Sequence, residues 1–195
     1  MHYTTDGNGP VVILIHGLFG DLDNLKSLAK NLEDSFTVVR IDVANHGSSQ
    51  RVSSMSYQSL AEDIKQLIDT LNISSAILVG HSMGGKIAMA TALKYPEIVS
   101  KLVVADIAPV SYNSRHDKVF NALETMPLES IKDRRDALTH MREHSIDEGT
   151  AQFLLKSLKR SELGFEWKMN LVGLKQSYAD IISWPTFTTP YGGPC

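Results

Sequence analysis

Cysteine is almost absent from this chain, which carries a single thiol, at Cys195, among its 195 residues. No internal disulfide can form, so a reducing compartment is the default and we expect a cytoplasmic protein. Long apolar runs are missing as well: the longest, residues 11–15, is far shorter than the about 20 residues that a membrane-spanning helix needs. Residues 1–10 lack the basic and apolar regions of a signal peptide. We therefore expect no membrane partner.

Charge of one sign is also missing. The chain has 19 lysines and arginines against 22 aspartates and glutamates, a formal net charge of -3. Because the basic side chains are scattered, they form neither a stripe for nucleic acid nor a polybasic patch for lipid headgroups. Nucleic acid is therefore excluded as a partner, and a small-molecule ligand is expected. The hydrophobic fraction of 43% suits one soluble domain with a sizeable core.

Four short runs of β-branched and aliphatic residues predict buried strands. They cover residues 11–15, 37–41, 76–79 and 102–105. Between the second and third runs, apolar residues recur at helical spacing after Ser56, a residue type suited to the N-cap. Between the third and fourth, residues 83–95 are rich in alanine and methionine and end before Pro96, which predicts a second helix. Strands that alternate with crossover helices favour an α/β fold, with a mostly parallel sheet flanked by helices.

The pattern changes after the fourth strand. Residues 111–183 have helical periodicity, many charges and no run typical of a strand. We expect this segment to form a helical lid on top of the sheet. The predicted organisation is an N-terminal part of the core (residues 1–110), the lid (residues 111–183), and the start of an interrupted C-terminal core (residues 184–195).

Residues 80–84 read Gly-His-Ser-Met-Gly, a GxSxG pattern between a predicted strand and a predicted helix. In that context the serine lies on a strained turn, the nucleophile elbow, which lifts its hydroxyl above the carboxyl edge of the sheet. Glycines flank it because a Cβ would collide with the strand or the helix. We predict that Ser82 is a nucleophile. The alternative is a Gly/Ser turn without chemistry.

Residues 16–20, His-Gly-Leu-Phe-Gly, directly follow the first predicted strand. In acyl transfer a negative oxygen develops, and fixed backbone N–H donors stabilise it by about 2.7–4 kcal/mol each. We expect the N–H groups of Leu18 and Met83 to form this oxyanion hole, with His16 orienting the loop. The alternative for this segment is an ordinary glycine turn.

Four motifs occur together in the chain. They are HGLFG at residues 16–20, IDVANHGSS at 41–49, GHSMGGK at 80–86 and DIAPV at 106–110. From about Val11 to Trp184, this combination resembles the α/β-hydrolase superfamily, and more narrowly its YbfF-like esterases. The resemblance implies the α/β-hydrolase fold with a helical lid. It also implies a cofactor-free serine hydrolase that cleaves carboxylic esters or thioesters through an acyl-enzyme, with the acyl chain undetermined. A cofactor-free haloperoxidase shares the serine elbow and is an alternative within this fold.

The resemblance places the acid of a catalytic triad at Asp106, which ends the fourth predicted strand. Its alternative role is to anchor the entry to the lid through backbone N–H groups. The triad histidine of this fold follows the last strand, and we find no such segment, so the base is expected to be absent from the chain. We therefore interpret the chain as truncated, without the C-terminal strands and helices. The alternatives are completion by a partner chain, as in a homodimer, and a non-catalytic hydrolase-like binding module.

The other histidines carry weaker signals. His2 lies in a ragged terminal segment, and His116 is expected to be a surface or lid-packing residue. His81 is too close to Ser82 along the chain to serve as its base. We expect His81 and Phe19 to contact the substrate in a largely apolar pocket.

His140 and His144 form the sequence HMREH, which matches the HxxEH pattern of inverted zinc peptidases. That pattern also needs a carboxylate ligand and an apolar-backed site. The charged neighbours Arg134, Arg135 and Asp136 indicate a solvated helix face instead. We predict no metal site and no cofactor.

Overall fold

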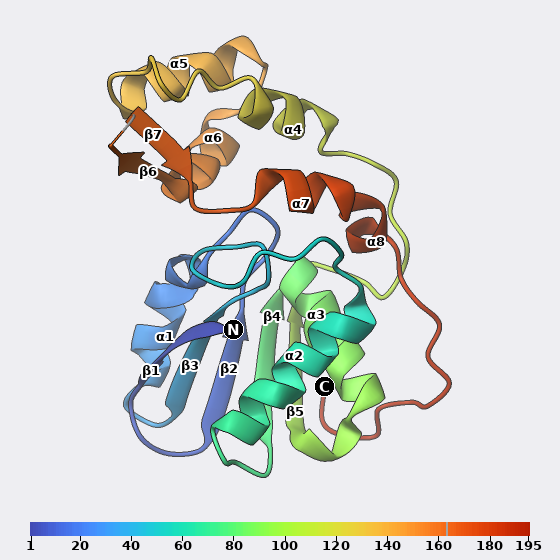
Figure 1. The fold of residues 1–195 in the computed structure, drawn as a ribbon. Helices are drawn as coiled ribbons and strands as arrows, with labels where there is room; N and C mark the ends of the chain where they lie inside the picture. Colours follow the sequence, from blue (N-terminus) through green and yellow to red (C-terminus); the bar gives the residue numbers. More distant parts are fainter. Residues whose placement is uncertain (163) are drawn as a thin grey trace.

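The computed structural model describes residues 1–162 and 164–195, with a five-stranded sheet at its centre (Figure 1). The strands are β1 (His2–Asp6), β2 (Val11–Ile15), β3 (Thr37–Asp42), β4 (Ala76–His81) and β5 (Val99–Ala105), in the spatial order β1-β3-β2-β4-β5. β1 runs antiparallel to β3, and all other neighbouring pairs are parallel. The predicted α/β class with a mostly parallel sheet is confirmed.

Helices cover both faces of the sheet. They are η1 (Leu22–Leu25), α1 (Lys26–Leu32), α2 (Tyr57–Thr70), α3 (Met83–Lys94) and η2 (Pro96–Ile98). Alternate β2 side chains point to opposite faces: Val12 and Leu14 pack with α1, whereas Ile13 and Ile15 join the larger cluster under α2 and α3. This double coverage explains why β2 is a continuous apolar run. The Ser56 hydroxyl accepts from a backbone N–H in the first turn of α2, which confirms the predicted N-cap.

The sequence did not predict β1, and the expectation of a ragged N-terminal segment is wrong for His2. This residue begins the strand, its N–H donates to the Ser49 hydroxyl (2.7 Å), and its ring Nδ1 lies 2.8 Å from Asp42 Oδ2. β1 is a largely exposed edge strand, and within the described residues it pairs only with β3. A strand in that position needs no apolar run, so hydrophobicity does not reveal it.

A smaller layer, here called the cap (residues 111–183), lies above the carboxyl ends of the parallel strands (Figure 1). Its elements are α4 (Asp117–Glu124), α5 (Arg134–Glu143), α6 (Glu148–Leu154), η3 (Leu155–Ser157), β6 (Leu158–Ser161), β7 (Gly164–Trp167), α7 (Leu171–Gln176) and α8 (Tyr178–Ile182). In the part of the chain described, no helix is both long and apolar enough to cross a membrane.

The prediction that this segment contains no strand is wrong, because β6 and β7 pair as an antiparallel ribbon. Each strand has four residues, and only Leu158 and Trp167 are buried. Lys159 and Glu166 face each other across the ribbon, 2.9 Å apart. Two buried side chains in short, charged strands leave too little alternation to be recognised in the sequence.

Candidate active site

Ser82 lies on a sharp turn between β4 and α3, with φ 53° and ψ -120°. This backbone conformation costs a non-glycine residue about 1–3 kcal/mol, and such strain gathers at functional sites. A Cβ on Gly80 would collide with the backbone of Gly84, and a Cβ on Gly84 would collide with the carbonyl of Ile15 in β2. The predicted crowding at both glycines is confirmed, and it lets α3 pack directly against the sheet.

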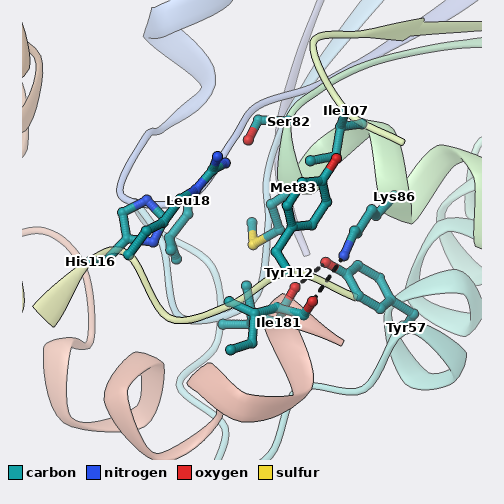
Figure 2. Close-up of a pocket in the computed structure, with 11 residues that line it drawn as sticks. Leu18, Tyr57, Ser82, Met83, Lys86, Ile107, Tyr112, His116 and Ile181 are labelled. Carbon is teal, nitrogen blue, oxygen red and sulfur yellow. Dashed lines mark hydrogen bonds between the residues drawn. The ribbon is translucent and has the colours of Figure 1, made fainter. Parts of the chain in front are cut away.

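Backbone hydrogen bonds hold the Ser82 turn from both sides. Its N–H donates to the Ala105 carbonyl at the end of β5 (2.9 Å), and its carbonyl accepts from Gly85 N–H in α3 (2.8 Å). The side chain faces a cavity (Figure 2). Among residues 1–162 and 164–195, no hydrogen bond joins this hydroxyl to a histidine. The turn is therefore held rigidly while the hydroxyl faces open space.

Leu18 and Met83 line the same cavity as Ser82 (Figure 2). Met83 is the first residue of α3, so its N–H has no acceptor within the helix. Within the described part of the chain, neither the Leu18 nor the Met83 N–H donates to a backbone acceptor. The two N–H groups that the sequence predicts as an oxyanion hole thus flank one cavity and are not engaged elsewhere in the backbone.

Two buried histidines hold the loop that carries Leu18. His16 accepts the Val43 N–H at Nε2 (3.1 Å), and its Nδ1 bonds the Gly17 carbonyl (2.8 Å). His46 accepts the Phe19 N–H at Nε2 (3.2 Å), and its Nδ1 bonds its own loop's backbone. These contacts leave no ring nitrogen free for proton transfer, and they agree with the expectation that His16 orients the loop.

Burial decides the protonation of both rings. It lowers the pKa of His16, and it lowers the pKa of His46 to about 3, with the neighbouring His16 adding to the effect. The two rings meet edge to face, 5.0 Å apart. Each ring accepts a backbone N–H at Nε2 and bonds a backbone carbonyl at Nδ1. Only a neutral imidazole has one accepting and one donating nitrogen, so both rings are neutral at pH 7.

Asp106 and His81 lie at the same edge of the sheet as Ser82. Asp106 follows β5 with φ 57°, its side chain is 89% exposed, and its Oδ2 is 3.9 Å from His81 Nε2. Both residues line a second cavity together with Ser82. In the described residues no backbone N–H donates to the Asp106 carboxylate, so the geometry does not favour the alternative role of an anchor for the cap.

Two cavities of different size meet at Ser82, and Leu18 and His116 line both. The smaller, about 30 Å³, extends from Ser82 toward Lys86 in α3. The larger, about 370 Å³, extends under the cap. Its lining includes Phe19, His81, Val119, Phe153 and Leu154. Phe19 and His81, predicted to contact substrate, therefore lie beside the larger, mostly apolar space.

Lys86 is a site residue that the sequence reasoning missed. Its side chain is buried in the smaller cavity, with Nζ 2.8 Å from the Ser183 carbonyl and 4.9 Å from the centre of the Tyr112 ring. Burial lowers the pKa of this ammonium to about 8, and Arg115 adds to the shift. The available signal was a lysine one helical turn after Ser82, with no other charged residue from Met83 to Leu93.

His116 has a second role beyond the packing expected for it. The ring packs edge-on against Phe19 and Tyr178, and its Nδ1 lies 2.7 Å from the Tyr178 hydroxyl. It also lines both cavities beside Ser82, which its position in the sequence did not indicate. Burial lowers the pKa of His116, and the Arg115 charge adds to this effect.

The His140 and His144 rings lie together, 4.3 Å apart, on the cap. His140 Nε2 bonds the Ala122 carbonyl (2.9 Å), and His144 Nδ1 bonds the His140 carbonyl (3.0 Å). Within the described residues, no group of three or more histidine, cysteine, aspartate or glutamate side chains could hold a metal ion.

A family model described as the alpha/beta hydrolase fold matches residues 10–130 of the chain. Over 91% of the chain, it is 41% identical to an esterase/lipase of Haemophilus influenzae and 39% identical to Esterase YbfF of Escherichia coli. The chain spans 62% and 68% of the lengths of these two relatives. It is 35% identical to an sn-1-specific diacylglycerol lipase of Danio rerio, covering 96% of the chain and 62% of that protein.

A solved structure described as a marine microorganism esterase is similar over 98% of the chain and 77% of its own length. The TM-score is 0.94 and the sequence identity is 36%. The arrangement of sheet, Ser82 turn and cap therefore recurs in an esterase.

Proposed function

The chain belongs to the α/β-hydrolase family, and on that premise we propose that it hydrolyses carboxylic esters or thioesters through an acyl-enzyme at Ser82. One observation carries the proposal: the strained Ser82 turn faces the same cavity as the unengaged N–H groups of Leu18 and Met83. A serine held this way, next to two fixed donors, is suited to attack a carbonyl whose oxygen becomes negative. Relatives named esterase and lipase support the same chemistry.

In the proposed reaction, Ser82 Oγ attacks the acyl carbon and passes its proton to a triad base, which returns it to the leaving alcohol or thiol; among the described residues no histidine is hydrogen-bonded to Ser82 for this role. The carbonyl oxygen gains the negative charge, and the Leu18 and Met83 N–H groups donate to it, worth about 2.7–4 kcal/mol each. The alcohol or thiol leaves with a proton. Water then attacks the acyl-enzyme, which releases the acid and restores Ser82. The N-terminal end of α3 points its positive dipole at the same oxygen.

Asp106 has the proposed role of the triad acid, which orients the base and stabilises its charged form. Its position beside Ser82 at the carboxyl edge of the sheet supports this role. Residues 111–183 are proposed as the lid over a core made of residues 1–110 and 184–195. Serine chemistry needs no cofactor, and the near absence of cysteine supports a cytoplasmic location.

A fluorophosphonate probe tests the proposal in the full-length protein, because it reacts only with an activated serine. We expect labelling and turnover of a short p-nitrophenyl ester in the native protein and in Ser74→Ala, which alters an exposed loop serine. Both signals should disappear in Ser82→Ala with an unchanged unfolding transition. Labelling that persists in Ser82→Ala would exclude Ser82 as the nucleophile.

A non-catalytic hydrolase-like module is the second candidate, favoured by the absence of a hydrogen bond between Ser82 and a histidine in the described residues. A serine without a base is a poor nucleophile, and loss of one triad member costs several orders of magnitude in rate. The same experiment separates the candidates. A native protein that binds an ester but neither turns it over nor takes the probe is such a module.

A further inference from the structure

The end of α8 is held against the core by two side chains. Tyr57 Oη donates to the Ile181 carbonyl (2.6 Å), and Lys86 Nζ donates to the carbonyls of Ile182 (3.2 Å) and Ser183 (2.8 Å). Figure 2 shows the hydrogen bonds to Ile181 and Ile182 as dashed lines. The carbonyls of a last helical turn have no partner within the helix and carry a partial negative charge. Lys86 and Tyr57 therefore act together as a clamp, and we keep that name for the pair.

The charge of Lys86 is compensated by dipoles. Only 1% of the residue is exposed, and within the described residues no carboxylate lies within ion-pair distance of its ammonium. The ammonium lies instead over two aromatic rings, 4.9 Å from the centre of Tyr112 and 5.6 Å from that of Tyr57. Ring faces and carbonyl oxygens are the partners that make such a buried cation tolerable. The lysine is thus committed to holding the end of α8.

The clamp closes the far end of the smaller cavity. This space begins at Ser82 and Met83, and it ends where Ile181 and Ile182 meet the clamp. Its volume of about 30 Å³ is less than a tenth of the 370 Å³ of the cavity on the other side of Ser82. Ile181 is 5% exposed, so the end wall is packed and has little freedom to retreat while the clamp is made.

An ester bound at Ser82 would place its acyl group in one of these cavities and its alcohol or thiol group in the other. The leaving alcohol or thiol and the incoming water both need room, and the larger cavity has the greater volume. The smaller cavity includes Met83, whose N–H is one of the two proposed oxyanion donors, and the side chains of Ile181 and Ile182 line its end. The acyl group of the ester is therefore the part that fits the smaller cavity.

We propose that Lys86 and Tyr57 determine the acyl-chain length of the substrate, because they hold Ile181 and Ile182 across the end of the smaller cavity. This inference rests on the proposed ester hydrolysis at Ser82. The cavity volume of about 30 Å³ is close to that of one water molecule, so the space suits only a short, uncharged acyl group. Longer chains enter only when the end of α8 moves away from the core.

The test compares p-nitrophenyl acetate, butyrate and octanoate as substrates of the full-length protein. We expect the native kcat/KM to fall at least tenfold from butyrate to octanoate. Lys86→Met keeps the length of the side chain but removes both hydrogen bonds, and it should raise the octanoate-to-butyrate ratio at least tenfold. Tyr57→Phe removes one hydroxyl and should raise it about threefold. Lys94→Met is the matched control, since Lys94 ends the same helix but pairs with Glu62 (2.6 Å), and its ratio should match the native value.

Ile181→Ala keeps the clamp and shortens the wall, so it should also raise the octanoate ratio; it provides a second reading if Lys86→Met fails to fold. Equal loss for all esters in Lys86→Met and Tyr57→Phe, with the ratio unchanged, would overturn the inference. A native preference for the mono-p-nitrophenyl ester of succinate over butyrate, lost in Lys86→Met, would also overturn it, by showing that the ammonium binds an anion. Failure of the proposed function looks different: no ester is turned over and the fluorophosphonate does not label Ser82.

Discussion

The core around Ser82 and the cap above it differ in how closely their backbones are packed. In the core, residues 13–15 of β2 have no exposed surface, and α3 touches strand backbone directly. The cap joins the core through side chains, both apolar and polar: the Phe120 ring packs edge-on against Phe19 (5.2 Å), the Ser157 hydroxyl donates to the Phe19 carbonyl (2.9 Å), and Lys168 Nζ lies 3.0 Å from Asp21 Oδ2. Close apolar packing tolerates almost no change, whereas single hydrogen bonds contribute about 0.5–1.5 kcal/mol each. The Ser82 turn therefore lies in the least adaptable part, and the cap above it is the part most easily altered.

The largest effect should come from adding one methyl group to each region. In Gly84→Ala the new Cβ collides with the Ile15 carbonyl, which cannot move without breaking the sheet, and we expect a loss of about 3 kcal/mol in unfolding free energy. In Gly149→Ala, on an exposed face of α6, the Cβ meets ordinary contacts, and alanine should stabilise the helix by about 0.5–1 kcal/mol. Urea denaturation measures both variants. Equal effects at the two positions would remove the contrast between core and cap.

A second effect concerns the buried histidines of the core. The folded protein keeps His46 neutral with a pKa of about 3, against 6.5 in the unfolded chain, so between these values only the unfolded chain gains a proton. The stability that His46 provides is full above pH 6.5 and is lost as the pH falls toward 3, by about 1.4 kcal/mol per pH unit. Burial also lowers the pKa of His16, so the stability that His16 provides falls with pH in the same direction.

His46→Asn keeps a donor and an acceptor but cannot titrate. Between pH 4 and 6, the slope of its unfolding free energy against pH should therefore be lower than in the native protein by about 1.4 kcal/mol per pH unit, which corresponds to one proton. The native protein, measured at the same pH values, is the reference for the slope. Chemical denaturation at several pH values gives the slopes. Identical slopes for His46→Asn and the native protein would mean that the loop under Leu18 opens to solvent.

The smallest effect should come from the polar contacts of the cap. Asn170 Nδ2 donates to Asn45 Oδ1 (2.8 Å), which links the start of α7 to the loop after β3. Asn170→Ala should cost about 1 kcal/mol in unfolding free energy and leave fluorophosphonate labelling of Ser82 intact. Asn121→Ala, on the exposed face of α4, is the matched control with no expected change. Loss of labelling in Asn170→Ala alone would show that the cap also maintains the Ser82 turn.

Patterns carried by neighbouring residues were enough for much of the fold. Apolar runs, helical spacing and glycines predict four of the five sheet strands, the Ser56 N-cap of α2 and the turn at Ser82, because each of these signals comes from residues close together in the chain. β1 and the β6–β7 ribbon escaped because an edge strand and a four-residue ribbon bury few side chains. Hydrophobic patterning detects burial, so elements with little burial leave no trace in it.

The site divides in the same way. The sequence alone determined the turn at Ser82, the crowding at its two flanking glycines and the position of the Met83 N–H beside it, because all of them lie within one strand-turn-helix segment. Only the tertiary structure decided what Lys86 does, since its carbonyl partners lie 96 and 97 positions further along the chain. The same holds for His116 beside Ser82. A local motif specifies backbone geometry through steric exclusion, whereas the partner of a buried charge depends on which distant segment the fold brings to it.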